Sequence, residues 1–212
     1  MGFDPKQDAL QKEETNRRIL DAGFCIFSEM SIDKVSMANV ANKAGIGIAT
    51  LYRYYRTKSE LVVAVGTHVW SNFIRDYMPI RNEDNTTAAE ELEFFLDSFL
   101  ELYKNHKKLL CFNQFFNIYI RNEAISKTAL NSYNEMVDQL AMRFHKTYVK
   151  GKNDKTLCTE VSENSMFLSI MHLMLAAITR YAVGLAYEKD IESDNELVLL
   201  KNMLMHEFSR KK

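Results

Sequence analysis

Seven consecutive residues, Tyr52 to Lys58, contain three tyrosines and three cationic side chains. The acid-free stretch around them, residues 34–58, holds five cations in a chain whose net charge is −1. Cations attract phosphate oxygens through their charge, and tyrosine hydroxyls can donate hydrogen bonds to the same oxygens. The cluster therefore favours a surface that binds nucleic acid, although it could also be a solvated face whose tyrosines only line the edge of the core. The five cations are Lys34, Lys43, Arg53, Arg56 and Lys58.

The segments that would position this cluster have the pattern of short helices. One is expected in SMANVANKAG, opened by the hydroxyl of Ser36 and closed at Gly45, where a left-handed residue is readily placed. A second is expected from near Gly47 to Arg56, after the tight turn AGIG. A longer helix precedes both, and its apolar face is marked by Ile19, Gly23, Ile26 and Met30. This arrangement predicts a helix-turn-helix, in which the second short helix enters the major groove of DNA.

The rest of the chain also has helical periodicity, so the sequence predicts an all-α protein. Its 212 residues are 47% apolar and include two prolines, and the apolar positions recur at helical spacing. Capping boxes are expected where Thr57, Thr87 and Ser193 each precede a glutamate by three residues. Further helices are expected over residues 107–121, 126–149, 157–187 and 194–208. We expect a helix-turn-helix domain over residues 10–57 and a larger helical domain over residues 58–212.

Five short motifs occur in order within residues 17–62. They are the apolar pattern of the first helix, Ser-Met at the start of the second, Ala-Gly-Ile at the turn, Thr-Leu-Tyr in the third helix and Lys-x-Glu-Leu at the start of the fourth. This segment resembles the DNA-binding domain of the tetracycline-repressor (TetR) family. The resemblance places Tyr55 where the family usually has a buried Phe, so its hydroxyl needs a partner. It implies backbone or phosphate contacts for Ser36, Thr50, Tyr52, Tyr54 and Lys58.

The residues that would face the base edges offer little hydrogen bonding. Gly47 and Ile48 occupy positions that often carry longer polar side chains in relatives, and neither side chain can hydrogen-bond a base. Ile48 could touch a thymine methyl group, and Arg53 or Lys43 could reach a guanine, whose O6 and N7 suit arginine. Much of the discrimination between sequences would then come from the shape of the DNA.

The TetR resemblance implies that the C-terminal domain dimerises and binds a small ligand. An apolar stripe on the last helix is expected to pack on a symmetry mate; its members are Leu197, Leu200, Leu204 and Phe208. Aromatic residues are dense between positions 95 and 136, where they could line an apolar pocket or simply form the core. The candidate ligand-binding residues are Phe99, Tyr103, Phe112, Phe115, Phe116, Tyr119, Tyr133, Met136 and His172.

Two polar residues, His172 and Arg180, interrupt the apolar segment 166–187 and are expected to be buried. Arg180 could bind a ligand carboxylate, pair with an acid across a dimer axis, or reach solvent. The segment is long enough to span a bilayer, but a central arginine opposes insertion. A helix covered by protein on two sides fits these residues better than a membrane span.

Other classes of protein fit the residues less well. The three cysteines are widely spaced and odd in number, which argues against a disulfide framework and a metal site, and residues 1–18 lack the apolar core of a signal peptide. The sequence has none of the motifs of di-iron bundles, zinc peptidases or serine hydrolases, and GIGIAT follows a helix instead of a strand. Turnover of a bound molecule would favour an enzyme, and failure to bind DNA at low salt would favour a helical adaptor.

These features predict a cytoplasmic, homodimeric DNA-binding regulator with no cofactor and no metal. We expect it to act as a repressor that binds an inverted-repeat operator. A small apolar or amphipathic molecule would release it, because aromatic residues and methionines dominate the candidate pocket.

Overall fold

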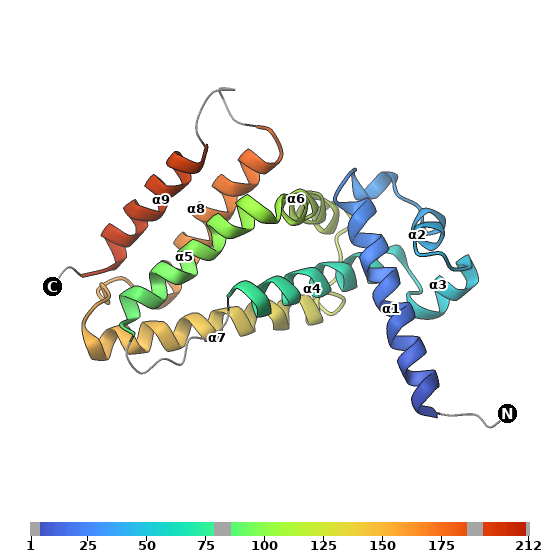
Figure 1. The fold of residues 1–212 in the computed structure, drawn as a ribbon, viewed down its shortest axis with the longest axis horizontal. Helices are drawn as coiled ribbons and strands as arrows, with labels where there is room; N and C mark the ends of the chain where they lie inside the picture. The colour runs from blue at the N-terminus through green and yellow to red at the C-terminus, as the bar shows by residue number, and fades with distance from the viewer. Residues whose placement is uncertain (1–4, 79–85, 186–192, 211–212) are drawn as a thin grey trace. The chain divides into compact units, whose positions relative to one another are not determined.

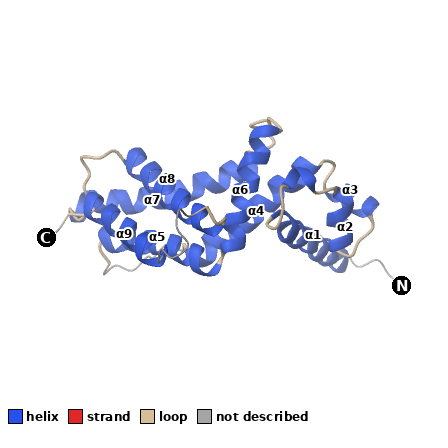
Figure 2. Ribbon diagram, turned by 90° about the horizontal axis from the view of Figure 1, so that it is seen from above, coloured by secondary structure: helices blue, strands red, loops and turns tan. Residues whose placement is uncertain are grey.

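The described parts of the chain fold mainly into helices (Figure 1). The computed structural model describes residues 5–78, 86–185 and 193–210, and within these ranges it contains nine α-helices and one 3-10 helix. Figure 2 shows only helices and loops in the described ranges, where the one extended pairing is an isolated bridge between Leu157 and Ser209. The predicted all-α class is confirmed.

The helices follow one another in a simple order along the chain. The N-terminal group comprises α1 (Pro5–Phe27), the 3-10 helix η1 (Ile32–Lys34), α2 (Met37–Lys43), α3 (Ile48–Tyr54) and α4 (Lys58–Tyr77). The later helices are α5 (Ala88–Asn105), α6 (Lys107–Asn122), α7 (Asn131–Asp154), α8 (Glu163–Ala182) and α9 (Ser193–Phe208). The short helices α2 and α3 are therefore present where the helix-turn-helix was expected.

Two of the later helices begin after their predicted starts. The Ser162 hydroxyl accepts a hydrogen bond from the Ser165 amide at 3.2 Å, and this cap starts α8 at Glu163 instead of near residue 157. Helix α7 spans Asn131–Asp154, so it is displaced toward the C-terminus from the predicted range 126–149. Apolar periodicity located both helices, but it did not locate their ends.

The predicted capping boxes differ in how their glutamates are used. At α5 the box is complete, because the Glu90 amide donates to the Thr87 hydroxyl at 3.3 Å and the Glu90 carboxylate accepts from the Thr87 amide at 2.6 Å. At α4 the Thr57 hydroxyl accepts from the Glu60 amide at 3.1 Å, whereas the Glu60 carboxylate accepts from the Arg56 amide at 2.8 Å. The predicted box at Ser193 depends on a side chain outside the described residues.

The chain forms two compact units. The first contains residues 1–71 and 112–134, and the second contains residues 72–111 and 135–212. Helices α4, α6 and α7 each contribute residues to both units. The domain boundary expected between residues 57 and 58 stays a prediction. The compact units divide α4 after residue 71, because its first part packs with the helix-turn-helix.

The core of the first unit joins α1, α2, α3 and α4 through aliphatic side chains. Ile19 on α1, Leu51 on α3 and Leu61 on α4 have no exposed surface, and Val40 on α2 is buried with them. Each helix therefore contributes one apolar side to a shared interior. Burial of an aliphatic side chain of this size stabilises the fold by about 1.5–3 kcal/mol.

The second half of α6 is anchored to this same core. The Phe112 ring meets the Phe24 ring of α1 edge to face, with ring centroids 5.8 Å apart. Helix α6 also approaches α4 closely at Gly66, where a Cβ atom would lie 2.9 Å from the Phe116 ring. Residues 112–122 therefore pack with the helix-turn-helix, although they lie well beyond it in sequence.

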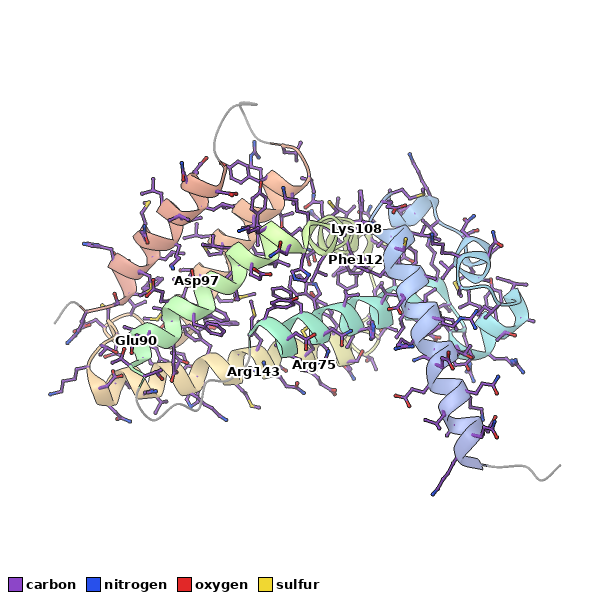
Figure 3. The ribbon with its side chains drawn as sticks, viewed as in Figure 1. Arg75, Glu90, Asp97, Lys108, Phe112 and Arg143 are labelled. Carbon is purple, nitrogen blue, oxygen red and sulfur yellow. The ribbon has the colours of Figure 1, made fainter. Side chains whose placement is uncertain are left out.

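In the second unit, α5 packs against both α8 and α9, and α8 packs against α9. The ammonium of Lys201 on α9 lies 2.5 Å from an Asp97 carboxylate oxygen and 3.0 Å from a Glu93 carboxylate oxygen, both on α5 (Asp97 is labelled in Figure 3). Burial acts to lower the pKa of Lys201, but hydrogen bonds and charge from the two carboxylates outweigh it and raise that pKa. This ion pair fixes which side of α9 faces α5.

The end of α4 is capped by a side chain from α7. The Arg143 guanidinium donates hydrogen bonds to the carbonyls of Ile74, at 3.1 Å, and Met78, at 2.8 Å (Figure 3). Carbonyls in the last turn of a helix lack intrahelical partners, and a cation also suits the negative end of the helix dipole. Arg143 therefore positions the last turn of α4 within the second unit.

Candidate nucleic-acid interface

The turn between α2 and α3 is fixed by Gly45 and by a side chain from α1. Gly45 has φ +66°, in the left-handed region that glycine adopts without strain, as the sequence predicted. The Arg18 guanidinium donates to the Ala44 carbonyl at 2.6 Å and to the Gly45 carbonyl at 3.3 Å. Arg18 therefore satisfies carbonyls at the end of α2. No sequence pattern predicts this contact, because it joins residues far apart in the chain.

Helix α3 has a buried side and a mixed outer side. Leu51 is fully buried, whereas Ile48 and Tyr52 are 41% and 48% exposed. Positions four residues apart lie on the same side of a helix, so Ile48 and Tyr52 share one face. Arg53 is exposed beside them and donates to the Thr50 hydroxyl at 3.3 Å. The outer side therefore offers an aliphatic, an aromatic and a cationic group.

Ser36 caps α2 in a capping box with Asn39. Its hydroxyl accepts a hydrogen bond from the Asn39 amide at 3.2 Å, and its own amide donates to the Asn39 side-chain oxygen at 2.9 Å. Lys43, in the last turn of α2, and Gly47, just before α3, are both exposed. The structure gives Ser36 a structural role, and contacts of all three residues with DNA stay predictions.

The tyrosines that follow Tyr52 are hydrogen-bonded to α1. The half-buried Tyr55 donates to the Asn16 side-chain oxygen at 2.7 Å, which is the partner that a buried phenol requires. Burial raises the pKa of Tyr55. The Tyr54 hydroxyl donates to the Lys12 carbonyl at 3.3 Å, so this residue also braces α3 against α1. The expectation for Tyr55 is confirmed, and a phosphate contact of Tyr54 stays a prediction.

Lys58, the first residue of α4, is half-buried and has partners within its own unit. Its ammonium nitrogen donates to the Asp33 carbonyl at 3.1 Å and lies 5.5 Å from the centroid of the Tyr119 ring. Burial lowers the pKa of Lys58, and the carboxylates of Asp33 and Glu123 act in the opposite direction. A phosphate contact of Lys58 stays a prediction, and the phosphate would share the ammonium with these two groups.

The candidate ligand-binding residues do not gather in one compact unit. The first unit contains Phe112, Phe115, Phe116, Tyr119 and Tyr133, and the second contains Phe99, Tyr103, Met136 and His172. Within the first unit, the Phe116 ring lies 5.5 Å from the Phe112 ring and 4.9 Å from the Tyr133 ring, measured between centroids. These aromatic residues form core contacts. Their role in a pocket stays a prediction.

The structure contradicts the expected use of the α9 stripe as a surface for a partner. Leu197, Leu204 and Phe208 are 1%, 5% and 5% exposed, and Leu200 is half-buried, because this side of α9 packs within the chain's own second unit. Periodicity identified the stripe, but it cannot tell whether an apolar side packs on its own chain or on another copy. The large apolar side chains that α9 exposes are instead Val198, Leu199 and Met203, at 43%, 58% and 59%.

The expected burial of His172 and Arg180 is wrong, since both are exposed. Helix α8 also exposes Leu168 and Leu173, at 39% and 48%, so its own chain covers only part of an almost wholly apolar helix. By length and composition α8 could cross a membrane, which is a weak sign because core helices of globular proteins pass the same test. The polar residues lie on the side that the chain leaves uncovered.

A polar residue that no sequence pattern singled out lies between α5 and α6. The His106 ring is 4.5 Å from the Tyr77 ring and 5.3 Å from the Phe73 ring, measured between centroids. Its Nε2 atom is buried without a hydrogen-bond partner among the described residues, and a Glu101 carboxylate oxygen lies 3.9 Å away. His106 therefore offers a hydrogen-bonding group in aromatic surroundings. A single histidine between two helices gave no signal in the sequence.

The fold and the outer side of α3 define a helix-turn-helix DNA-binding protein. Comparison with known families agrees, because residues 19–65 match the profile of bacterial regulatory proteins of the tetR family. Residues 19–65 therefore carry the DNA-binding domain of the TetR family, as the sequence motifs indicated, and the whole chain has the fold of a TetR regulator. Its relatives are named as transcription regulators, which agrees with the expectation of a regulator instead of an enzyme.

The similarity extends beyond the matched segment to different degrees. HTH-type transcriptional regulator SAR2658 of Staphylococcus aureus strain MRSA252 is 32% identical over 98 residues, which are 46% of this chain and 52% of that protein, so the match spans only half of that relative. SAS2464 of strain MSSA476 is 26% identical over 188 residues, covering 86% of this chain and 97% of that protein. A TetR transcription regulator from Haloarcula marismortui has the same fold, with a TM-score of 0.72, 18% identity and coverage of 93% and 100%.

Proposed function

We propose that this chain regulates transcription by placing α3 in the major groove of an operator. The observation that carries the proposal is the outer side of α3, where Ile48, Tyr52 and Arg53 are exposed within a stretch of chain that contains no acid. Phosphate attraction supplies most of the affinity for DNA of any sequence, and cations of the same stretch, such as Lys43, would provide it. Tyr54 and Tyr55 brace α3 against α1, and Arg18 fixes the turn before α3, so these contacts support the proposal.

Base readout through this surface is expected to be sparse. Arg53 is the one cation on α3, and a bidentate contact with guanine gives about 1–3 kcal/mol of discrimination against a wrong base. Ile48 is exposed enough to contact a thymine methyl group. DNA shape and the spacing of two half-sites would supply the remaining specificity.

Two half-sites require two copies of the chain. We define the α8–α9 outer face as the exposed side chains Leu168 and Leu173 of α8 with Leu199 and Met203 of α9, two helices that pack on each other. Apolar side chains of this size are not stabilised by exposure to water, so a symmetric partner that buries them would lower the free energy. A two-fold dimer through this face would match an inverted repeat.

The proposal also includes control of DNA binding by a small molecule. Aromatic rings cluster in the second unit, where the centroid of Phe95 lies 5.5 Å from that of Phe99 and 5.7 Å from that of Phe144. Such surroundings suit an apolar or amphipathic effector, and His106 replaces His172 as the candidate polar anchor. Binding of the effector would release the dimer from DNA, so the chain would act as a cytoplasmic repressor.

The DNA-binding proposal is tested by selecting bound duplexes from a random pool. The wild-type chain should enrich an inverted repeat, and Arg53→Ala should bind the enriched duplex more weakly. Arg121→Ala is the matched control, because Arg121 is an exposed arginine of the first unit outside the helix-turn-helix. Failure of the wild-type chain to bind any duplex at low salt would contradict the proposal.

The effector proposal is tested by identifying small molecules that copurify with the chain and titrating them in the presence and absence of the enriched duplex. Linkage requires that DNA weaken the effector by the same factor by which the effector weakens DNA, commonly about 5-fold to 150-fold. Equal affinity for the effector in both conditions would show that its binding does not control DNA binding.

A further inference from the structure

Lys58 is held by two groups from outside α4. Its ammonium donates to the carbonyl of Asp33 in η1, at 3.1 Å, and lies over the ring of Tyr119 in α6, at 5.5 Å from the centroid. All three residues belong to the first compact unit. An ammonium over an aromatic face is attracted by the electrons of the ring, and the attraction grows as water is excluded.

Tyr119 is itself fixed, so the ring is a permanent neighbour of Lys58. It is only 3% exposed, and its hydroxyl lies 3.1 Å from the hydroxyl of Ser59, the residue that follows Lys58. One turn earlier on α6, Phe116 lies against Gly66 of α4, where no side chain larger than hydrogen fits without a shift. The contacts at Ser59 and Gly66 keep this part of α6 against α4.

The charges near Lys58 also favour the held position. The carboxylates of Asp33 and Glu123 both interact with the ammonium, while burial removes part of its hydration. A phosphate that approaches Lys58 therefore meets two acids and a cation that already has partners. These surroundings differ from those of Lys34 and Lys43, which are exposed.

We propose that this contact is autoinhibitory: Tyr119 and the Asp33 carbonyl hold the ammonium of Lys58, and DNA phosphate must compete with them for it. The inference rests on the proposed DNA-binding function and adds a regulatory residue, Tyr119, from outside the helix-turn-helix. Tyr119 is a positioning residue that acts through Lys58. A phosphate that engages Lys58 attracts the same ammonium as the ring does, so DNA binding and the Lys58–Tyr119 contact oppose each other.

The first test measures affinity of the full chain for a random-sequence duplex at several salt concentrations. Tyr119→Leu removes the ring, and it should tighten binding about threefold per subunit, the size expected for a partly exposed cation–π contact. Ile118→Ala is the matched control, because Ile118 is exposed on the same helix and should leave affinity unchanged. In a Lys58→Ala background the gain from Tyr119→Leu should vanish.

Two further variants keep the test decisive if Tyr119→Leu does not fold. Tyr119→Phe retains the ring and loses only the hydroxyl contact with Ser59, so it should bind DNA like the wild type. Glu123→Gln removes an acid at an exposed position, and its gain in affinity should be smaller in the Lys58→Ala background than in the wild type. Persistence of the full Glu123→Gln gain in that background would overturn the proposal.

The second test needs no DNA. The rate constant for attack of the neutral amine of Lys58 on acetic anhydride, obtained from the pH dependence of modification by mass spectrometry, should be lower than those of Lys34 and Lys43 in the wild type. It should rise in Glu123→Gln and Tyr119→Leu. Equal rate constants for the three lysines in the wild type would overturn the held position.

The outcomes separate this inference from the function on which it rests. Unchanged or weaker DNA binding by folded Tyr119→Leu, or a gain that survives Lys58→Ala, would overturn the autoinhibitory contact and leave the DNA-binding function standing. Loss of all DNA binding in the wild type and every variant would overturn both.

Discussion

Helices α3 and α9 both expose large apolar side chains, but in opposite electrostatic surroundings. Ile48 and Tyr52 project from α3 in a stretch without acids, whereas Leu199 and Met203 project from a helix whose first turn contains two acids. A duplex can approach α3 because the nearby charges attract phosphate, and the acids of α9 disfavour the same approach. Under the proposed function, the charges beside each apolar surface determine the kind of partner, which is DNA at α3 and a second copy of the chain at α9.

The two helices are also attached to the protein in different ways. Helix α3 contributes one fully buried aliphatic side chain, Leu51, and is braced by the hydroxyls of Tyr54 and Tyr55. Helix α9 is held by an apolar stripe that includes Leu204 and by the ion pair of Lys201 with α5. Loss of one buried side chain of α9 should therefore lower the free energy of unfolding more than loss of one of the tyrosine hydrogen bonds of α3.

The largest expected effect comes from the buried side of α9. Leu204→Ala should lower the free energy of unfolding by about 2–5 kcal/mol, because it removes buried methyl groups and leaves a cavity. Met142→Ala, on an exposed position of α7, is the control and should change stability by less than about 0.5 kcal/mol. Urea denaturation monitored by circular dichroism measures both, and equal values would mean that α9 is not packed as described.

The outer side of α9 should affect assembly more than folding. Leu199→Asp should raise the dimer dissociation constant about thirtyfold, corresponding to about 2 kcal/mol for a carboxylate placed in an apolar interface. Analytical ultracentrifugation over a range of concentrations measures this constant, with Met142→Asp as the control. A Leu199→Asp chain that dimerises like the wild type would exclude the α8–α9 outer face as the interface.

The tethers of α3 should each contribute less. Tyr55→Phe removes the hydrogen bond to Asn16 and should lower the free energy of unfolding by about 1 kcal/mol. The pKa of Tyr55 is raised above its ordinary 10.0, so the neutral phenol contributes fully to the free energy of unfolding below pH 10. This contribution declines as the pH rises through the folded-state pKa. The loss of stability above pH 10 should accordingly be shallower in Tyr55→Phe, as thermal denaturation at several pH values would show.

The smallest effect concerns the salt dependence of DNA binding. If Arg53 contacts a phosphate, Arg53→Ala should reduce the slope of log affinity against log salt by about 0.9 in each half-site. If it reads a guanine instead, the slope should stay constant while discrimination between duplexes falls. Titrations with the enriched and a random duplex at several salt concentrations distinguish the two roles.

Local signals in the sequence were sufficient to predict the helix-turn-helix. The cap of Ser36 on α2 and the left-handed turn at Gly45 follow from neighbouring residues, and both are confirmed, as is the Thr87 box of α5. Helical periodicity also found the apolar stripe that includes Leu204. It could not find the side on which that stripe is covered, because the partner helices lie elsewhere in the sequence.

The contacts that could not be predicted are those between distant segments. Arg18 meets carbonyls at the end of α2, and Tyr119 meets residues at the start of α4. Neither pairing has a fixed sequence spacing, so no pattern reveals it. The wrong expectation that His172 is buried has the same cause. The sequence of an apolar helix does not show which of its sides the rest of the chain covers.

The contacts of α1 determine how this protein could be divided in engineering. Lys12, Asn16 and Arg18 supply the partners of Tyr54, Tyr55 and the turn after α2, and all three precede residue 19, where the segment matched to the family begins. A chimeric regulator built by transplanting residues 19–65 onto another effector domain would keep the recognition helix but lose its three braces. A graft that starts at the beginning of α1 and retains residues 112–134 would transfer α3 together with the side chains that hold it in place.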